Sequence, residues 1–181
     1  MNLRDKIFDY LQSKQPERSC RFPHLDQPLK VLLIYESDVL ERNDGIKNIR
    51  QELLRRQMDV TMWGFVEKKD IQTLILPQSR ILGLRDYNLL GKPRDYVVSD
   101  LQAEHYDLLI DLTLRPMRAL RYIAMYADAD FKVGMNLGEG IHDMLIAMPT
   151  TFNEQGEPLP VEASALFEQI MKYLTTIKSN D

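Results

Sequence analysis

The sequence has little cysteine and no long apolar segment. Its 181 residues include a single cysteine, Cys20, so no internal disulfide can form. No apolar run approaches the roughly 18 residues that a membrane-spanning helix requires. The first residues alternate charged with apolar side chains, unlike the continuous apolar core of a secretory signal. We therefore expect a cytoplasmic protein that does not enter a membrane.

Several signatures of cofactor and metal chemistry are also absent. The turn after the first apolar run, YESDVLERNDG, has one glycine where the dinucleotide-binding fingerprint needs three. The patterns GxxxxGK[ST] and GxSxG do not occur, and neither do HExxH or paired CxxC. These absences argue against NAD enzymes, P-loop NTPases and α/β-hydrolases, and we expect neither a cofactor nor a metal site.

The overall composition is that of one ordinary globular domain. Hydrophobic residues make up 44% and charged residues 28% of the chain, and the net charge is −4. An acidic balance argues against general nucleic-acid binding. The basic loop at 80–96, which is interleaved with tyrosines, is interpreted as a solvated loop rather than an RNA contact.

The stretch from His105 to Met135 predicts a strand, a helix and a second strand. Leu108–Leu112 is an apolar run typical of a strand buried on both faces of a parallel sheet. Pro116 stands where a helix can begin, and Phe131–Met135 is the next apolar run. This is the pattern of a βαβ unit with a right-handed crossover.

A second unit of the same kind precedes it. Val31–Tyr35 is a fully apolar strand, apolar residues at helical spacing follow over 40–54, and Val60–Trp63 is the next strand. Two such units predict a Rossmann-like, doubly wound α/β domain with a mostly parallel sheet.

The edges of the sheet are predicted from weaker patterns. We expect a helix over 66–76, a third strand at Arg80–Leu84 and a helix over 97–106. Met144–Met148 reads as a last strand. Its connection to the preceding strand is shorter than the dozen residues of a parallel crossover, so we expect it to pair antiparallel at an edge.

The two ends of the chain are expected to be helical. Residues 1–28 are predicted to form an N-terminal helix and a proline-containing arm, and 29–181 the single Rossmann-like domain. A C-terminal amphipathic helix is predicted from apolar residues at helical spacing, namely Ala163, Leu166, Phe167, Ile170, Met171, Leu174 and Ile177. The apolar stripe could cover the sheet or form a homodimer.

Open α/β sheets bind ligands beyond the carboxyl ends of their strands. Several polar residues follow strand ends in this sequence or lie in the glycine-rich stretch NLGEGIH. The candidate ligand-binding residues are Asp38, Asp111, Arg115, Arg118, Asn136, Glu139 and His142.

Each group of candidates has a functional and a structural interpretation. Arg115 and Arg118 near a helix start favour an anion beside Asp111, but they also fit a solvated helix face. Glu139 and His142 suit acid–base chemistry, but a structural role for a single such pair is as consistent with the sequence.

Two resemblances follow from these motifs. The passage YDLLIDLTLRPMRALRYIAMYADADFKVGM resembles part of the N-terminal domain of heptosyltransferase-type GT-B glycosyltransferases, whose catalytic acid would correspond in position to Asp38. The chain after Met148 is too short for the second domain of that family. The element DYNLLGKP at 86–93 and the LIAM strand are similar to a bacterial family of small α/β proteins of unknown function.

Two functions therefore stay open. The first is a small domain that binds a small anionic ligand or a protein partner without chemistry of its own, corresponding to the acceptor half of a GT-B enzyme. The second is an enzyme that acts on a small anionic or sugar-phosphate substrate, with Asp38 or Asp111 as base and Arg115 as anion clamp.

Overall fold

The computed structural model describes residues 3–37, 44–68, 78–138 and 140–177. It is an α/β fold with one six-stranded sheet in the order β3-β2-β1-β4-β5-β6. The strands are β1 (Lys30–Glu36), β2 (Asp59–Phe65), β3 (Ser79–Leu82), β4 (His105–Asp111), β5 (Asp128–Met135) and β6 (Met144–Ile146). The helices are α1 (Leu3–Ser13), α2 (Asp44–Arg55), α3 (Asp95–Gln102), α4 (Arg118–Tyr126) and α5 (Ala163–Thr176), with a 3-10 turn η1 (Leu84–Asp86).

The centre of the sheet is the parallel pair β1 and β4. Val31 lies opposite Leu108, and the register continues to Ile34 opposite Asp111. The residues from Val31 to Tyr35 are all buried because helices cover both faces of the sheet. The predicted Rossmann-like, doubly wound arrangement is confirmed.

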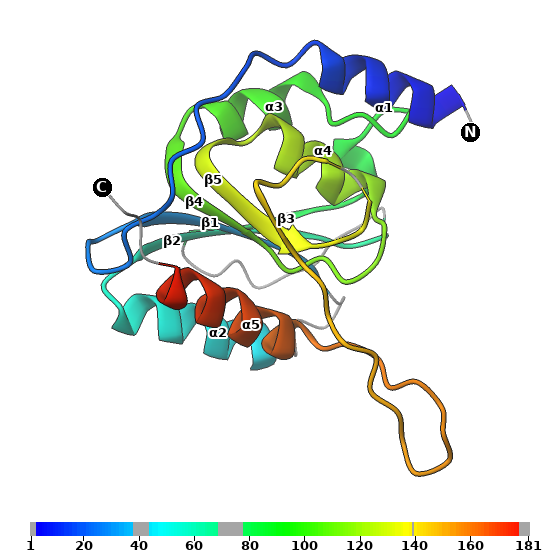
Figure 1. Ribbon diagram of the computed structural model, residues 1–181. Helices are drawn as coiled ribbons and strands as arrows, with labels where there is room; N and C mark the ends of the chain where they lie inside the picture. Colours follow the sequence, from blue (N-terminus) through cyan, green and yellow to red (C-terminus); the bar gives the residue numbers. More distant parts are fainter. Residues whose placement is uncertain (1–2, 38–43, 69–77, 139, 178–181) are drawn as a thin grey trace.

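Helices form a layer on each face of the sheet. Figure 1 shows α2 and α5 together on one face and α1, α3 and α4 on the other. Helix α5 buries Leu166, Phe167 and Ile170 in the core that it shares with α2, so the predicted C-terminal amphipathic helix is confirmed. Its apolar stripe covers the sheet, and Ile177 at its end stays exposed.

The predicted antiparallel edge strand is wrong, because β6 pairs parallel to β5. Val133 lies opposite Met144 and Met135 opposite Ile146. Strand β6 pairs with only the last three positions of β5. The connection therefore returns over about 10 Å along the strand direction rather than over the length of a full strand. Residues 136–143 connect the two strands, and the described residues among them form no helix. The expectation that a parallel connection needs about a dozen residues holds for full-length strands and fails for a pairing of three residues.

The other weakly patterned elements agree in kind but not in their bounds. Strand β3 ends at Leu82 rather than at Leu84, where η1 begins. Helix α3 ends at Gln102, and Tyr106 is already part of β4. Most of the helix predicted over 66–76 lies outside the described residues. No described helix is long and apolar enough to cross a membrane.

Helix α1 is attached to α4 by a single buried side chain. Phe8 is fully buried, with its ring centroid 4.9 Å from that of Tyr122 in an edge-to-face contact. The guanidinium of Arg121 lies 4.2 Å from the same ring. This contact fixes the N-terminal helix on the α4 side of the sheet.

Truncation of this anchor tests the attachment. Phe8→Ala should lower the free energy of unfolding by about 3 to 5 kcal/mol, because it removes a buried ring from between two helices. Tyr10→Ala changes a largely exposed ring of the same helix and should alter stability by less than about 0.5 kcal/mol. Urea unfolding of both variants provides the measurement, and equal effects would contradict the anchoring role of Phe8.

Candidate functional site

Two of the predicted residues meet in a buried pair. The Nε2 atom of His142 lies 3.0 Å from Asp111 Oδ2, and both side chains are more than nine-tenths buried. The other Asp111 oxygen accepts a hydrogen bond from the backbone N–H of Thr113 at 2.9 Å. The pair is close-fitting, because a Cβ on Gly134 would lie 2.8 Å from His142 Nε2. Asp111 and His142 are therefore buried on the face of the sheet that α4 covers.

The two predicted arginines are engaged in ion pairs. Arg115, at the end of the sheet, binds both carboxylate oxygens of Glu36, and its Nε lies 3.0 Å from Glu36 Oε2. This pairing raises the pKa of the Arg115 guanidinium further. Arg118 donates to Asp5 of α1 at 2.6 Å. The structure does not bring either arginine to Asp111.

The remaining predicted residues contribute little to a site. Asn136 is exposed, and its side-chain oxygen accepts a hydrogen bond from the backbone N–H of Gly138 at 3.3 Å. Asp38 and Glu139 lie outside the described residues.

A cavity of about 570 Å³ lies at the carboxyl ends of β1 and β4. The sheet order reverses between these two strands, which is the usual ligand position in open α/β sheets. Its walls come from the ends of the two strands and from the first turns of α2 and α5. The main lining residues are Tyr35, Glu36, Ser37, Ile46, Leu112, Leu114, Glu162 and Ser164.

The charges around this switch-point cavity are negative. Its lining includes Glu36, Asp44 and Glu162, and among the described residues no lysine, arginine or histidine lines it. Two of these carboxylates have partners: Asp44 has Lys47 at 3.5 Å, and Glu162 accepts a hydrogen bond from the Ser164 hydroxyl at 3.3 Å. The arrangement disfavours an anionic ligand.

The basic loop predicted to be solvated is largely tied to the domain. Arg80 pairs with Asp100, and its guanidinium lies 4.8 Å from the ring centre of Trp63. Tyr87 is buried and donates its hydroxyl hydrogen to the carbonyl of Ala119 at 3.2 Å. Arg80 and Tyr87 therefore make contacts within the fold.

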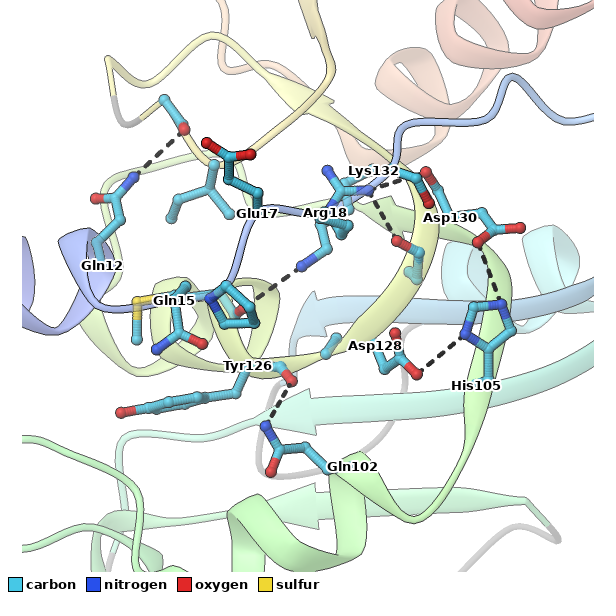
Figure 2. A pocket seen from close by; sticks show the side chains of 17 residues that line it. Gln12, Gln15, Glu17, Arg18, Gln102, His105, Tyr126, Asp128, Asp130 and Lys132 are labelled. Atoms are coloured by element: carbon cyan, nitrogen blue, oxygen red, sulfur yellow. Dashed lines mark hydrogen bonds and ion pairs between the residues drawn. The ribbon is translucent and has the colours of Figure 1, made fainter.

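A second cavity, of about 670 Å³, lies between the N-terminal arm and the start of β5 (Figure 2). Lys132 lies on its wall and is only 3% exposed. Its Nζ donates to the carbonyls of Ala124 at 2.7 Å and Met125 at 3.4 Å, at the end of α4. Lys132 was not among the residues predicted from the sequence, although a lysine within the apolar run FKVGM was a visible signal.

Burial perturbs the Lys132 amine. Loss of hydration lowers its pKa from the ordinary value of 10.5 to about 8, with a smaller contribution from the positive charge of Arg18. The negative charges of Asp143 and Asp128 act in the opposite direction and raise the pKa of Lys132. The amine is thus partly neutral near physiological pH, which is unusual for a lysine.

The tight packing around His142 gives a prediction. Gly134→Ala should destabilise the fold by about 1 to 3 kcal/mol, because its methyl group overlaps His142 and Asp111. In a His142→Ala background the same change should have a much smaller effect. A double-mutant cycle measured by urea unfolding gives the coupling, and additive effects would show that Gly134 is not constrained by His142.

The Lys132 pKa predicts a pH dependence of stability. Below pH 8 the amine is protonated in both states, and folding bears the cost of burying its charge. Between pH 8 and 10.5 unfolding takes up a proton, so stability rises with pH. Relative to Lys132→Met, the wild-type chain should gain about 3 kcal/mol across this range. Parallel curves for the two proteins over pH 7 to 10.5 would contradict the lowered pKa.

Comparison with known proteins identifies a family for this chain. No curated protein and no solved structure matches the chain. A protein-family model described as a family of unknown function (DUF6913) matches residues 2–177. Because that match covers nearly the whole sequence, the chain belongs to this family of unknown function.

Proposed function

We propose that the protein binds a small, uncharged, hydroxyl-rich ligand of about monosaccharide size in the switch-point cavity and performs no chemistry on it. The observation that carries this proposal is the position of the cavity. It opens between the carboxyl ends of β1 and β4, where the sheet order reverses. Its volume of about 570 Å³ lies within the range of small-molecule sites.

The chemistry of the walls favours hydroxyl groups. Glu36 and Glu162 each have a partner, yet a carboxylate has about four lone-pair positions and can accept further hydrogen bonds. The first turn of α5 presents backbone N–H groups that lack partners within the helix. Hydroxyl groups both donate and accept, so a sugar or polyol satisfies both kinds of group.

A phosphate or carboxylate ligand would meet repulsion in the same place. The lining has three carboxylates and, among the described residues, no cationic side chain. Arg115, the expected anion clamp, is held by both oxygens of Glu36. This disfavours the enzyme that would act on an anionic sugar phosphate.

The lack of catalysis is supported by the placement of the titratable groups. Asp111 and His142 are more than nine-tenths buried, and neither is among the residues that line the switch-point cavity. Asp111 shares its face of the sheet with Leu109, which packs in the core under α3 and α4, whereas Tyr35 and Leu112 belong to the opposite core. Among the described residues, the Asp111–His142 pair therefore does not face the ligand position.

The sequence resemblance supports the same class of ligand. The passage at 106–135 resembles the acceptor half of heptosyltransferase-type glycosyltransferases, in which a sugar acceptor is the expected ligand. The exposed, unpaired Cys20 is consistent with a reducing compartment, and we place this function in a bacterial cytoplasm.

A thermal-shift comparison tests the proposal. The purified protein is screened against uncharged monosaccharides and polyols and against the matching sugar phosphates. A ligand at about 100 times its dissociation constant adds about 2.7 kcal/mol, which should raise the midpoint by roughly 5 to 10 °C. We expect uncharged sugars to give the larger shifts.

Two matched variants locate the site. Ser164→Leu places a larger side chain in the cavity wall and should abolish the shift, whereas Ser99→Leu makes the same change on the exposed face of α3 and should preserve it. Larger shifts with sugar phosphates, or a shift that survives Ser164→Leu, would refute the proposed ligand or its position. A flat screen at millimolar sugar would refute the binding of the sugars tested.

A further inference from the structure

The cavity in Figure 2 is separate from the switch-point cavity. Its walls come from the arm after α1, the end of α4 and the start of β4 and β5, and it shares no lining residue with the other cavity. Lys132 is the one lysine among its described lining residues. This site therefore presents a single primary amine at the edge of a space large enough for a small organic molecule.

The position of the amine is fixed. Two hydrogen bonds, to Ala124 O at 2.7 Å and Met125 O at 3.4 Å, hold the Nζ atom against the end of α4. No ion pair between Lys132 and a carboxylate is formed within the described part of the chain. Both hydrogen bonds use the N–H groups of the amine, so a neutral amine held in this way keeps its lone pair available.

Apart from Glu17, which is exposed, the other charged groups around the cavity have hydrogen-bond or ion-pair partners. His105 contacts Asp128 at 3.0 Å and Asp130 at 3.3 Å. Arg18 donates to the Asp143 carboxylate at 2.6 Å and to backbone carbonyls of β5. The remaining surface includes the apolar side chains of Met125 and Ile141. This environment suits a ligand without charge.

We propose that Lys132 forms a reversible imine with a small, uncharged aldehyde or ketone bound in this cavity. The Nζ lone pair attacks the carbonyl carbon, and a proton passes from nitrogen to the resulting alkoxide to give a carbinolamine. The carbinolamine then takes up a proton from solvent and loses water, which forms the C=N bond of a protonated imine. No oxidant or reductant is needed, and hydrolysis reverses the reaction.

The hydrogen bonds of Lys132 are compatible with this product. A protonated imine keeps one N–H, which suffices for the shorter bond to Ala124 O, while the longer bond to Met125 O is given up. The end of α4 thus serves as a fixed support for the reacting nitrogen.

Reductive trapping on the wild-type protein tests this inference. The protein is treated at pH 7 with butanal and cyanoborohydride, which reduces an imine to a stable butylamine, and each lysine is followed by peptide mass spectrometry. Lys172, exposed on α5, is the internal reference. At pH 7 a pKa of about 8 gives Lys132 a neutral fraction roughly 300 times that of an amine at the ordinary value of 10.5, so its labelling should be faster by at least tenfold even though the amine is buried.

Three controls separate a reactive site from ordinary surface labelling. Unfolding in urea should remove the preference for Lys132. Lys132→Met should lose the fast phase, and Lys172→Met should retain it. Labelling of Lys132 that is no faster than that of Lys172, or a preference that persists in urea, would overturn the proposal. The sugar screen reports on the other cavity, so either inference can fail without the other.

Discussion

The pairing of β1 with β4 is the constraint on which the rest of the structure depends. These strands bring together the two βαβ halves, and the order of the sheet reverses between them. Helices α2 and α5 cover one face of the sheet, and their first turns border a space at the carboxyl ends of β1 and β4. The switch-point cavity is therefore a consequence of the topology, and its lining is set by which residues end β1 and β4.

Alternation along the strands then decides which polar groups can meet. Asp111 lies opposite Gly134 in the register, and both belong to the α4 side of the sheet. Lys132 precedes Gly134 by two positions and points to that side as well, where it reaches the end of α4. The switch-point cavity is on the other side. Residues that are adjacent in sequence, such as Asp111 and Leu112, consequently lie on opposite faces of the sheet and in different environments.

The central fold was predictable from the sequence because buried parallel strands are continuous apolar runs, as Val31–Tyr35 shows. The direction of β6 was not, because three paired residues do not need a full crossover. For the candidate site, the sequence suggested Asp111 beside Arg115 and His142 beside Glu139, whereas the structure pairs Asp111 with His142. The sequence did not show that Arg115 would pair with Glu36, because the partner of a long flexible side chain depends on the three-dimensional arrangement of its neighbours. Lys132 was not predicted because ligand sites in open α/β sheets are expected at the carboxyl ends of the strands, and Lys132 lies inside β5.

The burial of Lys132 is difficult to explain as helix capping alone. Carbonyls at the end of a helix can be satisfied by water or by a lysine whose amine stays hydrated, and neither requires removal of a charge from water. Here the amine is only 3% exposed and lacks an ion-pair partner among the described residues, so its charged form is destabilised in the folded state. A methionine would fill the same volume without that penalty. An amine at this position, beside a cavity, therefore indicates a use for its neutral form.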